Sequence, residues 1–431
     1  MERYNEYKDS SVQWLGEIPS HWECEKAKRH FQSRKQIVGR NSSQYERLAL
    51  TLKGVIKRFE GDGVGLNPEK LDTYQIVDKD DLIFKLIDLE NVSTSRVGLS
   101  PYKGIVSPAY IRISAVDEVN IRFAEYYYLN MWMRHIFNDL GTPGVRSNLS
   151  STDLLNLPLL YPSIVEQKAI ATYLDKATAK IDETIAQQQK MIDLLNERKQ
   201  IIINNAVTKG LNPDAPMKDS GVEWIGEIPE HWEVMKLKHV TSKIGSGSTP
   251  RGGAEVYQDS GIMFLRSQNV YNDGLKLDDV AHIVDGVHQK MKGTQVKYND
   301  ILYNITGGSI GRCCCYDRED EANVNQHVSI VRPKGIIAKY LMYNLQSDNA
   351  QRQLRETLKG GNREGLAAVT FKEFLILTCP KEEQNQIVSH IERMFVNIDR
   401  AISNATKQIS LLQERKQIII NDVVTGKVKV C

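Results

Sequence analysis

The sequence predicts an α+β fold with two pseudo-symmetric mixed α/β domains, separated by an antiparallel two-helix coiled coil. Two internal repeats lead to this prediction. The segment DSSVQWLGEIPSHW (residues 9–22) returns as DSGVEWIGEIPEHW (219–232), with ten of fourteen positions identical at an offset of 210. The segment LNERKQIIINNAVT (195–208) returns as LQERKQIIINDVVT (412–425), with eleven of fourteen identical at an offset of 217. Two similar halves can form an object with two equivalent working surfaces.

Each half opens with a W-[LI]-G-E-I-P-x-H-W segment, which contains Trp14 in the first half and Trp224 in the second. Such a segment either packs the start of its half against the helix ends or forms a docking surface for a partner protein. Packing is favoured, because Trp and Ile are commonly buried in protein cores.

A long mixed region follows each opening segment, at about 22–161 and 232–379. Short β-like runs in these regions are separated by Gly, Asn and Asp turns. Residues 81–84 (DLIF) correspond to residues 300–303 (DILY), and GVRSNL (144–149) corresponds to GNREGL (361–366). Between these anchors the residues diverge. We therefore expect similar frames with different loops, suited to two different ligands of one class.

A long helix is predicted to close each half. The first runs from about residue 164 to 206, and its apolar positions recur in alternating steps of three and four, as in a coiled-coil seam. This seam comprises Ile170, Leu174, Ala177, Ile181, Ile185, Ile192, Leu195 and Ile202, with polar Gln188 and Lys199 completing the rhythm. The second helix repeats it 217 residues later with Ile387, Ile391, Met394, Ile398, Ile402, Ala405, Ile409, Leu412 and Ile419. Narrow seams with polar flanks favour pairing of the two helices over packing of each helix on its own domain. Roughly 40 residues give each helix a length of about 60 Å.

Composition narrows the class of protein. The 431 residues suffice for two to four domains, and the net charge is only +2. A nucleic-acid partner would therefore need local positive potential, or a second protein that supplies part of it. The start of the chain has no signal-type apolar stretch, and no run approaches the roughly 20 residues of a membrane span. A cytoplasmic location without membrane contact is expected.

The three contiguous cysteines at 313–315 lack the C-x-x-C spacing of a zinc site. Reduced thiols along a strand are the favoured interpretation, and no metal site is expected. The sequence also lacks the G-x-x-x-x-G-K-[ST], G-x-S-x-G and H-E-x-x-H motifs and the N/D-P-P-[YF] signature of amino-methyltransferases. The E-R-K triplets at 197–199 and 414–416 are better explained as charged coiled-coil flanks than as nuclease residues. These absences favour a binding protein over an enzyme.

Several loops in both halves combine small polar residues with Arg, Lys, Asn and Gln. Arg, Asn and Gln can hydrogen-bond base edges at two points, and Gly lets the backbone approach a phosphate. These loops therefore indicate DNA contact. The candidate residues are Arg96, Ser107, Tyr110, Arg146 and Asn148 in the first half, and Ser248, Thr249, Arg251, Arg266, Gln268, Asn269, Arg312, Asn325, Gln326, His327, Asn362 and Arg363 in the second. Arg146 and Arg363 are the strongest single candidates, with bridging from the loop to the following helix as their alternative role.

Three features together resemble the specificity (S) subunit of Type I restriction–modification systems. They are the opening segment DSGVEWIGEIPEHW, the skeletal runs NDILYNITG and NQHVSIVRP, and the helix pattern E-Q…I…I-D…L-L-x-E-R-K-Q-x-I-I. The resemblance covers nearly the whole chain. It implies target-recognition domain 1 with its N-terminal conserved segment at 1–161 and a central conserved helix at 162–210. Target-recognition domain 2 would then span 211–379, and a C-terminal conserved helix 380–431.

The resemblance also implies a function. Each domain would read one half of an interrupted double-stranded DNA target, about one helical turn (~34 Å) from the other. The subunit would have no catalytic activity and no cofactor. It would bind two methyltransferase (M) subunits that carry S-adenosylmethionine and, in the full enzyme, two ATP-dependent restriction (R) subunits. SPAY (107–110) stands where the second half has NQHV (325–328), so roles cannot be transferred between the halves at this point. Open alternatives are a Type IIB-like specificity subunit, a coiled-coil scaffold without a nucleic-acid role, and an enzyme with an unfamiliar site.

Overall fold

The computed structural model describes residues 2–52, 54–59, 70–89, 95–140, 148–359 and 365–430. The chain divides into two compact units. Unit 1 comprises Met1–Gln189 with Thr406–Cys431, and unit 2 comprises Lys190–Ala405. The two longest helices, α4 (Ile164–Lys209) and α9 (Lys381–Val424), each contribute one part to each unit.

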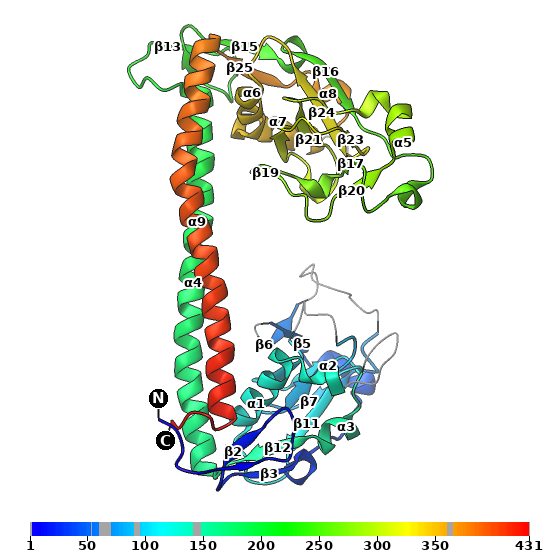
Figure 1. Ribbon diagram of the computed structural model, residues 1–431, viewed down its shortest axis with the longest axis vertical. Helices are drawn as coiled ribbons and strands as arrows, with labels where there is room; N and C mark the ends of the chain where they lie inside the picture. Colours follow the sequence, from blue (N-terminus) through cyan, green and yellow to red (C-terminus); the bar gives the residue numbers. More distant parts are fainter. Residues whose placement is uncertain are drawn as a thin grey trace. The chain divides into compact units, whose positions relative to one another are not determined.

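Unit 1 contains a mixed domain built on two four-stranded sheets (Figure 1). The sheet β6-β5-β10-β7 comprises β5 (Arg47–Thr51), β6 (Gly54–Arg58), β7 (Gln75–Val77) and β10 (Gly104–Val106). The sheet β4-β11-β8-β9 comprises β4 (Phe31–Gln32), β8 (Leu82–Phe84), β9 (Val97–Leu99) and β11 (Ile111–Ala115). Two-stranded pairs join β1 (Tyr7–Asp9) to β2 (Glu17–Pro19) and β3 (Glu23–Lys26) to β12 (Pro158–Tyr161). The short helices are η1 (Ala27–Arg29), η2 (Gly39–Gln44), α1 (Ile121–Met133), α2 (Ile136–Leu140) and α3 (Ser151–Asn156).

Unit 2 contains a domain with a four-stranded and a three-stranded sheet. The sheet β16-β24-β21-β22 comprises β16 (Thr241–Ser246), β21 (Ile301–Asn304), β22 (Cys313–Cys315) and β24 (Val328–Pro333). The sheet β20-β17-β23 comprises β17 (Ile262–Leu265), β20 (Ala281–Ile283) and β23 (Ala322–Val324). Strand pairs join β13 (Met217–Asp219) to β14 (Glu227–Pro229), β15 (Glu233–Lys236) to β25 (Leu375–Thr378), and β18 (Val270–Tyr271) to β19 (Gly274–Leu275). The short helices are η3 (Leu237–His239), η4 (Gly253–Val256), η5 (Ser267–Asn269), α5 (Asp285–Lys290), η6 (Lys292–Thr294), η7 (Gly307–Ser309), α6 (Ala338–Gln346), α7 (Asp348–Lys359) and α8 (Ala368–Phe371).

The two domains share one topology. In each four-stranded sheet that begins with β4 or β16, all neighbouring strands are antiparallel and follow the same order. In the other sheet of unit 1, β5 pairs with β10 in parallel, and in unit 2 β17 pairs with β23 in parallel. β6 and β20 are the corresponding edge strands of these two sheets. The place of β7 is taken in unit 2 by a single bridge between Gln295 and Asn323. The predicted likeness of the two frames is therefore confirmed.

A buried ion pair occupies the same place in both frames. Arg112 contacts Asp81 at 2.6 Å, and Arg332 contacts Asp300 at 2.7 Å. Both carboxylates also accept a backbone N–H from the residue three positions earlier. Burial raises the pKa of Asp81, although Arg112 and the backbone N–H act in the opposite direction. The matching sequences DLIF (81–84) and DILY (300–303) thus each begin with an aspartate. Its carboxylate fixes the start of β8 in unit 1 and of β21 in unit 2.

We expect Asp300→Ala to lower the free energy of unfolding by about 3 kcal/mol, because it leaves Arg332 half-buried without its counter-charge. Denaturant unfolding of the full chain measures this cost. Asp320→Ala is the matched control, because Asp320 pairs with Arg318 at the surface, where such pairs contribute about 0–1 kcal/mol. Equal effects of the two substitutions would contradict the structural role of Asp300.

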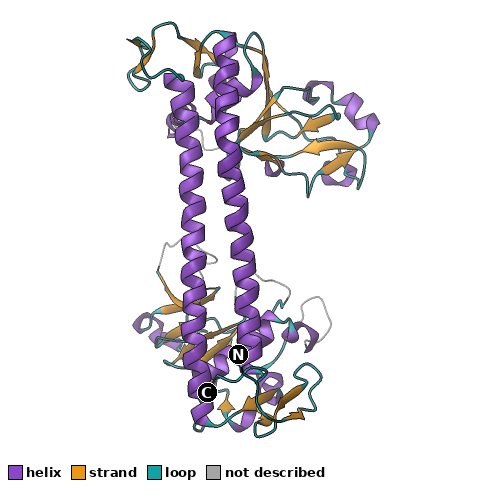
Figure 2. Ribbon diagram, turned by 60° about the vertical axis from the view of Figure 1, so that its left-hand side comes forward, coloured by secondary structure: helices purple, strands orange, loops and turns teal. Residues whose placement is uncertain are grey.

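The long helices α4 and α9 lie side by side in both views (Figures 1 and 2). In unit 1, Lys416 of α9 contacts Asp182 of α4 at 2.7 Å; in unit 2, Lys199 of α4 contacts Asp399 of α9 at 2.8 Å. Each contact repeats the other at the offset of 217, as the sequence seams require. The antiparallel two-helix coiled coil is therefore confirmed. No helix in the described ranges is long and apolar enough to cross a membrane.

The seam residues are buried or half-buried along both helices. The helix ends also join the domain cores. Ile170 and Ile420 share one core cluster with Trp22, whereas Ile203 and Ile387 share another with Trp232. Pairing of the helices and packing on the domains, which the sequence presents as alternatives, thus occur together.

The repeated opening segment closes onto the first turn of a long helix in each unit. The indole N–H of Trp22 donates to Glu166 at 3.2 Å, and His21 contacts the same carboxylate at 2.9 Å. The second unit repeats this arrangement, with Trp232 donating to Glu383 at 3.1 Å. Trp22 and Trp232 are both fully buried. These contacts explain why the H-W pair returns unchanged, and they support the packing interpretation of the segment.

Candidate nucleic-acid interface

The candidate loops of unit 2 converge where β16, β17, β21 and β23 end. The backbone N–H of Ser248, after β16, donates to Val324 at 3.2 Å, and that of Asn325, after β23, donates to Leu265 of β17 at 3.1 Å. The N–H of Ile305, after β21, donates to the carbonyl of His327 at 3.0 Å. Loops far apart in the sequence therefore form one edge, which we name the unit 2 edge.

Four side chains connect the loops of the unit 2 edge in a hydrogen-bonded chain. The hydroxyl of Thr249 donates to Oε1 of Gln326, and Nε2 of Gln326 lies 3.1 Å from Nε2 of His327. Nδ1 of His327 lies 2.6 Å from the hydroxyl of Thr306. Thr249 and Gln326 are exposed, whereas His327 is half-buried. We call these residues the Gln326 chain. The sequence did not single out Thr306, although it opens the T-G-G-S-I-G-R loop.

Gly247 holds the start of the Gly-rich loop against the turn after β23. A Cβ at this position would lie 2.0 Å from the carbonyl oxygen of Val324 and 2.4 Å from that of Asn325. No side chain fits so close to two backbone oxygens. Gly365 is similarly constrained beside Thr306, with φ at +145°. These two glycines therefore permit the close packing of the loops at the unit 2 edge.

We expect Gly247→Ala to displace the loop that carries Thr249 and to impair DNA recognition by unit 2. Gly245→Ala is the matched control two residues earlier, because a Cβ there meets nothing within 4 Å. Binding to a cognate duplex should fall for the first variant and stay unchanged for the second. The same loss in both variants would contradict the close-approach argument.

Four candidates of unit 2 have structural contacts. Asn269 is buried and its Oδ1 accepts the backbone N–H of Arg266 at 2.9 Å. Asn325 is buried and accepts the backbone N–H of His327 at 3.2 Å. Gln268 is exposed, and its amide donates to Asp279 at 2.6 Å. Arg266 contacts the same Asp279 carboxylate at 3.4 Å. Asn269 and Asn325 thus shape the loops from inside, while Arg266 and Gln268 share a carboxylate at the surface. The remaining candidate on the Gly-rich loop, Arg251, is exposed.

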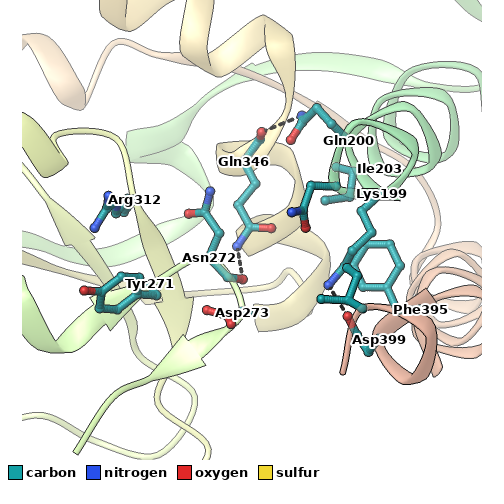
Figure 3. Close-up of a pocket in the computed structure, with 12 residues that line it drawn as sticks. Lys199, Gln200, Ile203, Tyr271, Asn272, Asp273, Arg312, Gln346, Phe395 and Asp399 are labelled. Carbon is teal, nitrogen blue, oxygen red and sulfur yellow. Dashed lines mark hydrogen bonds and ion pairs between the residues drawn. The ribbon is translucent and has the colours of Figure 1, made fainter. Parts of the chain in front are cut away.

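Arg312 is not among the residues whose hydrogen bonds form the Gln326 chain. Its guanidinium lies 4.8 Å from the ring centre of Tyr271, a cation–π distance. Both residues line a pocket of about 400 Å³ between the β18–β19 hairpin and the unit 2 parts of α4 and α9 (Figure 3). Across this pocket, Gln200 of α4 donates to the carbonyl of Gln346 at 2.9 Å. Arg312 therefore lines the same pocket as side chains of α4 and α9, from the side opposite the helices (Figure 3).

In unit 1, the turn after β10 corresponds to the turn after β23. The buried amide of Gln75 donates to the carbonyls of Ser107 at 3.1 Å and Tyr110 at 2.5 Å. Lys35, which the sequence did not single out, donates to Pro108 at 3.1 Å. Burial raises the pKa of Tyr110, and the positive charge of Arg58 acts in the opposite direction. A rigid turn beside cationic side chains is therefore the unit 1 counterpart of the Asn325–His327 turn.

Arg96 has an internal role that the sequence did not indicate. It is 1% exposed, and its guanidinium donates to the carbonyls of Lys85, Ile87 and Asp88. It precedes β9 as Arg312 precedes β22, yet only Arg96 is buried. As placed, Arg96 fixes the segment after β8 from inside and does not reach a surface ligand. Burial of this guanidinium argues against the predicted contact with DNA.

Asn148–Leu149 in unit 1 and Gly365–Leu366 in unit 2 are anchored alike. Asn148 forms a bridge with Ile87, and the N–H of Leu149 donates to Leu86 at 3.0 Å. In unit 2, the N–H of Leu366 donates to Ile305 at 2.8 Å. Both anchors follow the equivalent strands β8 and β21. The expected contacts at Arg146, Asn362 and Arg363 lie outside the described residues.

Cys313 and Cys314 of β22 are buried inside the domain, and Cys315 is half-buried. Burial raises the pKa of Cys314 and of Cys315 to about 12, so both thiols are protonated at neutral pH. Among the described residues, no group of three or more His, Cys, Asp or Glu side chains is arranged to hold a metal ion.

These features define a duplicated recognition protein, with two like frames that carry unlike polar edges and are joined to paired helices. Residues 28–193 and 229–410 each match the model of the Type I restriction modification DNA specificity domain. The chain therefore belongs to the family of Type I restriction–modification DNA specificity subunits.

Relatives support this assignment. The Type I restriction enzyme MjaVIII specificity subunit of Methanocaldococcus jannaschii is 25% identical over 378 residues, which cover 86% of this chain and 84% of the relative. The EcoBI specificity subunit of Escherichia coli is 26% identical over 309 residues, 69% of this chain and 64% of the relative. A solved chain from work on complex assembly and conformational transition of the type I R-M system has a TM-score of 0.66 at 14% identity. It matches 95% of this chain and 99% of its own length, which supports the fold.

Proposed function

We propose that this DNA specificity subunit reads an asymmetric, bipartite target, with one domain for each half-site. The observation that carries the proposal is the contrast between a shared topology and unlike edges: Asn325–His327 in unit 2 is replaced by Ser107–Tyr110 in unit 1. Two like frames favour two sites on one kind of ligand, and unlike edges favour two different base sequences. Target-recognition domains at 1–161 and 211–379, with conserved helices at 162–210 and 380–431, are part of this proposal.

Each edge would enter the major groove, where all four base pairs differ in their hydrogen-bonding pattern. The proposed contacts are Ser107, Tyr110, Asn148, Ser248, Thr249, Arg251, Gln326 and His327, together with Arg146, Asn362 and Arg363. Arg266, Gln268 and Arg312 are assigned to the margin of the interface. Lys35, near the Ser107–Tyr110 turn, would contact phosphate, because an exposed Lys acts as a point charge.

The paired helices would act as a ruler that sets the spacer between the half-sites. α4 and α9 are single helices of 46 and 44 residues. The rise of a continuous helix is about 1.5 Å per residue, so residue number alone sets its length. The repeated Lys–Asp contacts and the shared seam support a fixed register between the helices.

The same helices would carry the partner subunits. Two apolar pairs face solvent at the offset of 217: Leu194 with Ile201 in unit 2, and Leu411 with Ile418 in unit 1. They are between 50% and 54% exposed. Residues seven apart lie on one face of a helix, and an exposed apolar face favours a partner helix. We call the pairs the twin stripes. Because the two stripes have the same residue types, each would bind one copy of the same partner.

We infer that this partner is the methyltransferase (M) subunit, which binds S-adenosylmethionine. In a full restriction enzyme, two ATP-dependent restriction (R) subunits would join the complex. The specificity chain itself would have no catalytic activity and no cofactor, so methyl transfer and cleavage would belong to its partners. Turnover by the chain alone would contradict this division of roles.

Selection of bound duplexes from a random pool tests the proposal, with the chain purified together with its methyltransferase partner. Two short blocks of unlike sequence at a constant separation are expected. Enrichment of one continuous block would contradict the bipartite reading, and no enrichment would favour a scaffold without a nucleic-acid role. Identification of the proteins in the purified complex distinguishes the Type IIB-like alternative, because its partner proteins would differ from those of a Type I system.

A further inference from the structure

We propose that Gln326 reads one adenine in the half-site that unit 2 recognises. This inference deepens the proposed function, on which it rests, by naming one base and the side chain that reads it. It starts from an unusual combination at the unit 2 edge, where the amide of Gln326 is exposed and yet held at both ends by neighbouring side chains.

The hydrogen bonds of the Gln326 chain fix the direction of this amide. Oε1 accepts the hydroxyl proton of Thr249, and Nε2 donates to Nε2 of His327 at 3.1 Å. A neutral imidazole that accepts at Nε2 carries its proton on Nδ1. That proton faces the hydroxyl oxygen of Thr306, 2.6 Å away. The hydrogen bonds therefore form one consistent sequence from Thr249 to Thr306.

The backbone below the amide is fixed as well. The N–H of His327 donates to the side chain of Asn325 at 3.2 Å, and the N–H of Val328 donates to the carbonyl of Asn325 at 3.1 Å. Asn325 and Val328 are buried on either side of the exposed Gln326. The turn thus presents one polar side chain from a rigid base. An exposed Gln normally loses rotamer freedom on binding, and this one has already lost most of it.

The remaining hydrogen-bonding capacity of the amide matches adenine. A Gln side chain has two N–H donors and two lone pairs on its oxygen. Thr249 and His327 use one of each, so Gln326 retains one donor and one acceptor. Adenine offers an acceptor at N7 beside a donor at N6, whereas guanine offers two acceptors in the same place. Among the purines, adenine alone satisfies both remaining groups.

The turn of unit 1 that corresponds to Asn325–His327 lacks a glutamine. Its equivalent turn contains Pro108 and Ala109, neither of which has a polar side chain. We therefore expect a hydrogen-bonded glutamine to read adenine in the half-site of unit 2 and not in that of unit 1. This difference contributes to the asymmetry of the target.

The test maps the methylated motif in cells that express the chain with its methyltransferase partner. Gln326→Glu should lower the preference for adenine at one position by roughly 10- to 100-fold, because a carboxylate cannot donate to N7. Cytosine should gain at that position, because its N4 group donates to carboxylates. All positions of the other half-site should remain unchanged, which also shows that the variant folds and assembles.

Two further variants examine the role of the chain of hydrogen bonds. Thr249→Val, which removes the hydroxyl, should reduce discrimination at the same position, and Thr249→Ser should restore it. Gln289→Glu is the charge-matched control, because Gln289 is exposed on α5 and its amide contacts Asp285 at 3.2 Å, away from the Gln326 chain.

An unchanged motif in Gln326→Glu overturns the inference, as does a change at a base other than adenine. Both outcomes leave the proposed function intact. If the unmodified chain gives no bipartite motif, the proposed function itself fails.

Discussion

Insertion of one heptad into both α4 and α9 is expected to lengthen the DNA spacer and to leave both half-sites unchanged. The insertions belong between Gln189 and Lys190 and between Ala405 and Thr406, where the two units meet along the chain. Seven residues preserve the seam and add about 10 Å of helix. At about 3.4 Å per base pair, the spacer should grow by about three base pairs. Mapping of methylated adenines in a genome reports both the spacer and the half-sites.

A matched control inserts the heptad into α4 alone. The seam residues of the two helices then fall out of register, so the Lys–Asp contacts at Lys199 and Lys416 cannot both form. This variant should lose specific methylation, whereas the double insertion should keep it. If the double insertion changed the recognised bases and kept the spacer, the helices would not be the ruler.

Lysine substitution of one of the twin stripes is expected to remove one of two methyltransferase subunits. In Leu194→Lys with Ile201→Lys, two charges replace side chains that would be buried against the partner, and a desolvated charge without a counter-charge costs several kcal/mol. The second stripe, at Leu411 and Ile418, remains intact. Native mass spectrometry of the purified complex should therefore show one M subunit in place of two.

The converse variant, Leu411→Lys with Ile418→Lys, should also retain one M subunit, and the combination of both should retain none. Glu197→Lys is the control, because Glu197 is an exposed polar residue on the same helix as the first stripe. Two bound M subunits in either stripe variant would show that the partners dock elsewhere.

The sequence allowed the fold to be predicted well because periodicity and repetition are local properties. The first helix begins at Ile164, as predicted. The 217-residue repeat of its seam in the second helix corresponds to the paired contacts Lys199–Asp399 and Lys416–Asp182. The equivalence of Asp81 and Asp300 was also visible, since both stand before a strand of the same pattern. Their salt-bridge partners were not, because Arg112 and Arg332 lie on distant strands.

Roles within the candidate site could be predicted only in part. Loop composition separates polar from apolar segments, but burial depends on how distant segments pack. Arg96 and Arg312 precede equivalent strands, and only the arrangement of the neighbouring loop decides that Arg96 binds carbonyls while Arg312 lies over Tyr271. The same reason explains why Asn269 and Asn325, which look like surface amides in the sequence, are buried.

The assembly of the Gln326 chain was equally invisible in the sequence. Its members come from loops after β16, β21 and β23, which are separated by up to about 80 residues. Thr306 opens the T-G-G-S-I-G-R loop, but its role depends on the position of His327. Contacts of this kind become apparent only when the strand order is known.

The most direct test of the account is a genome-wide map of methylated adenines in cells that carry this chain and its methyltransferase partner as the sole such system. The account predicts a single motif with two unlike blocks and a spacer of constant length. A motif that is continuous, or one whose two blocks are identical, would contradict the claim that two unlike domains read one DNA molecule at a fixed separation.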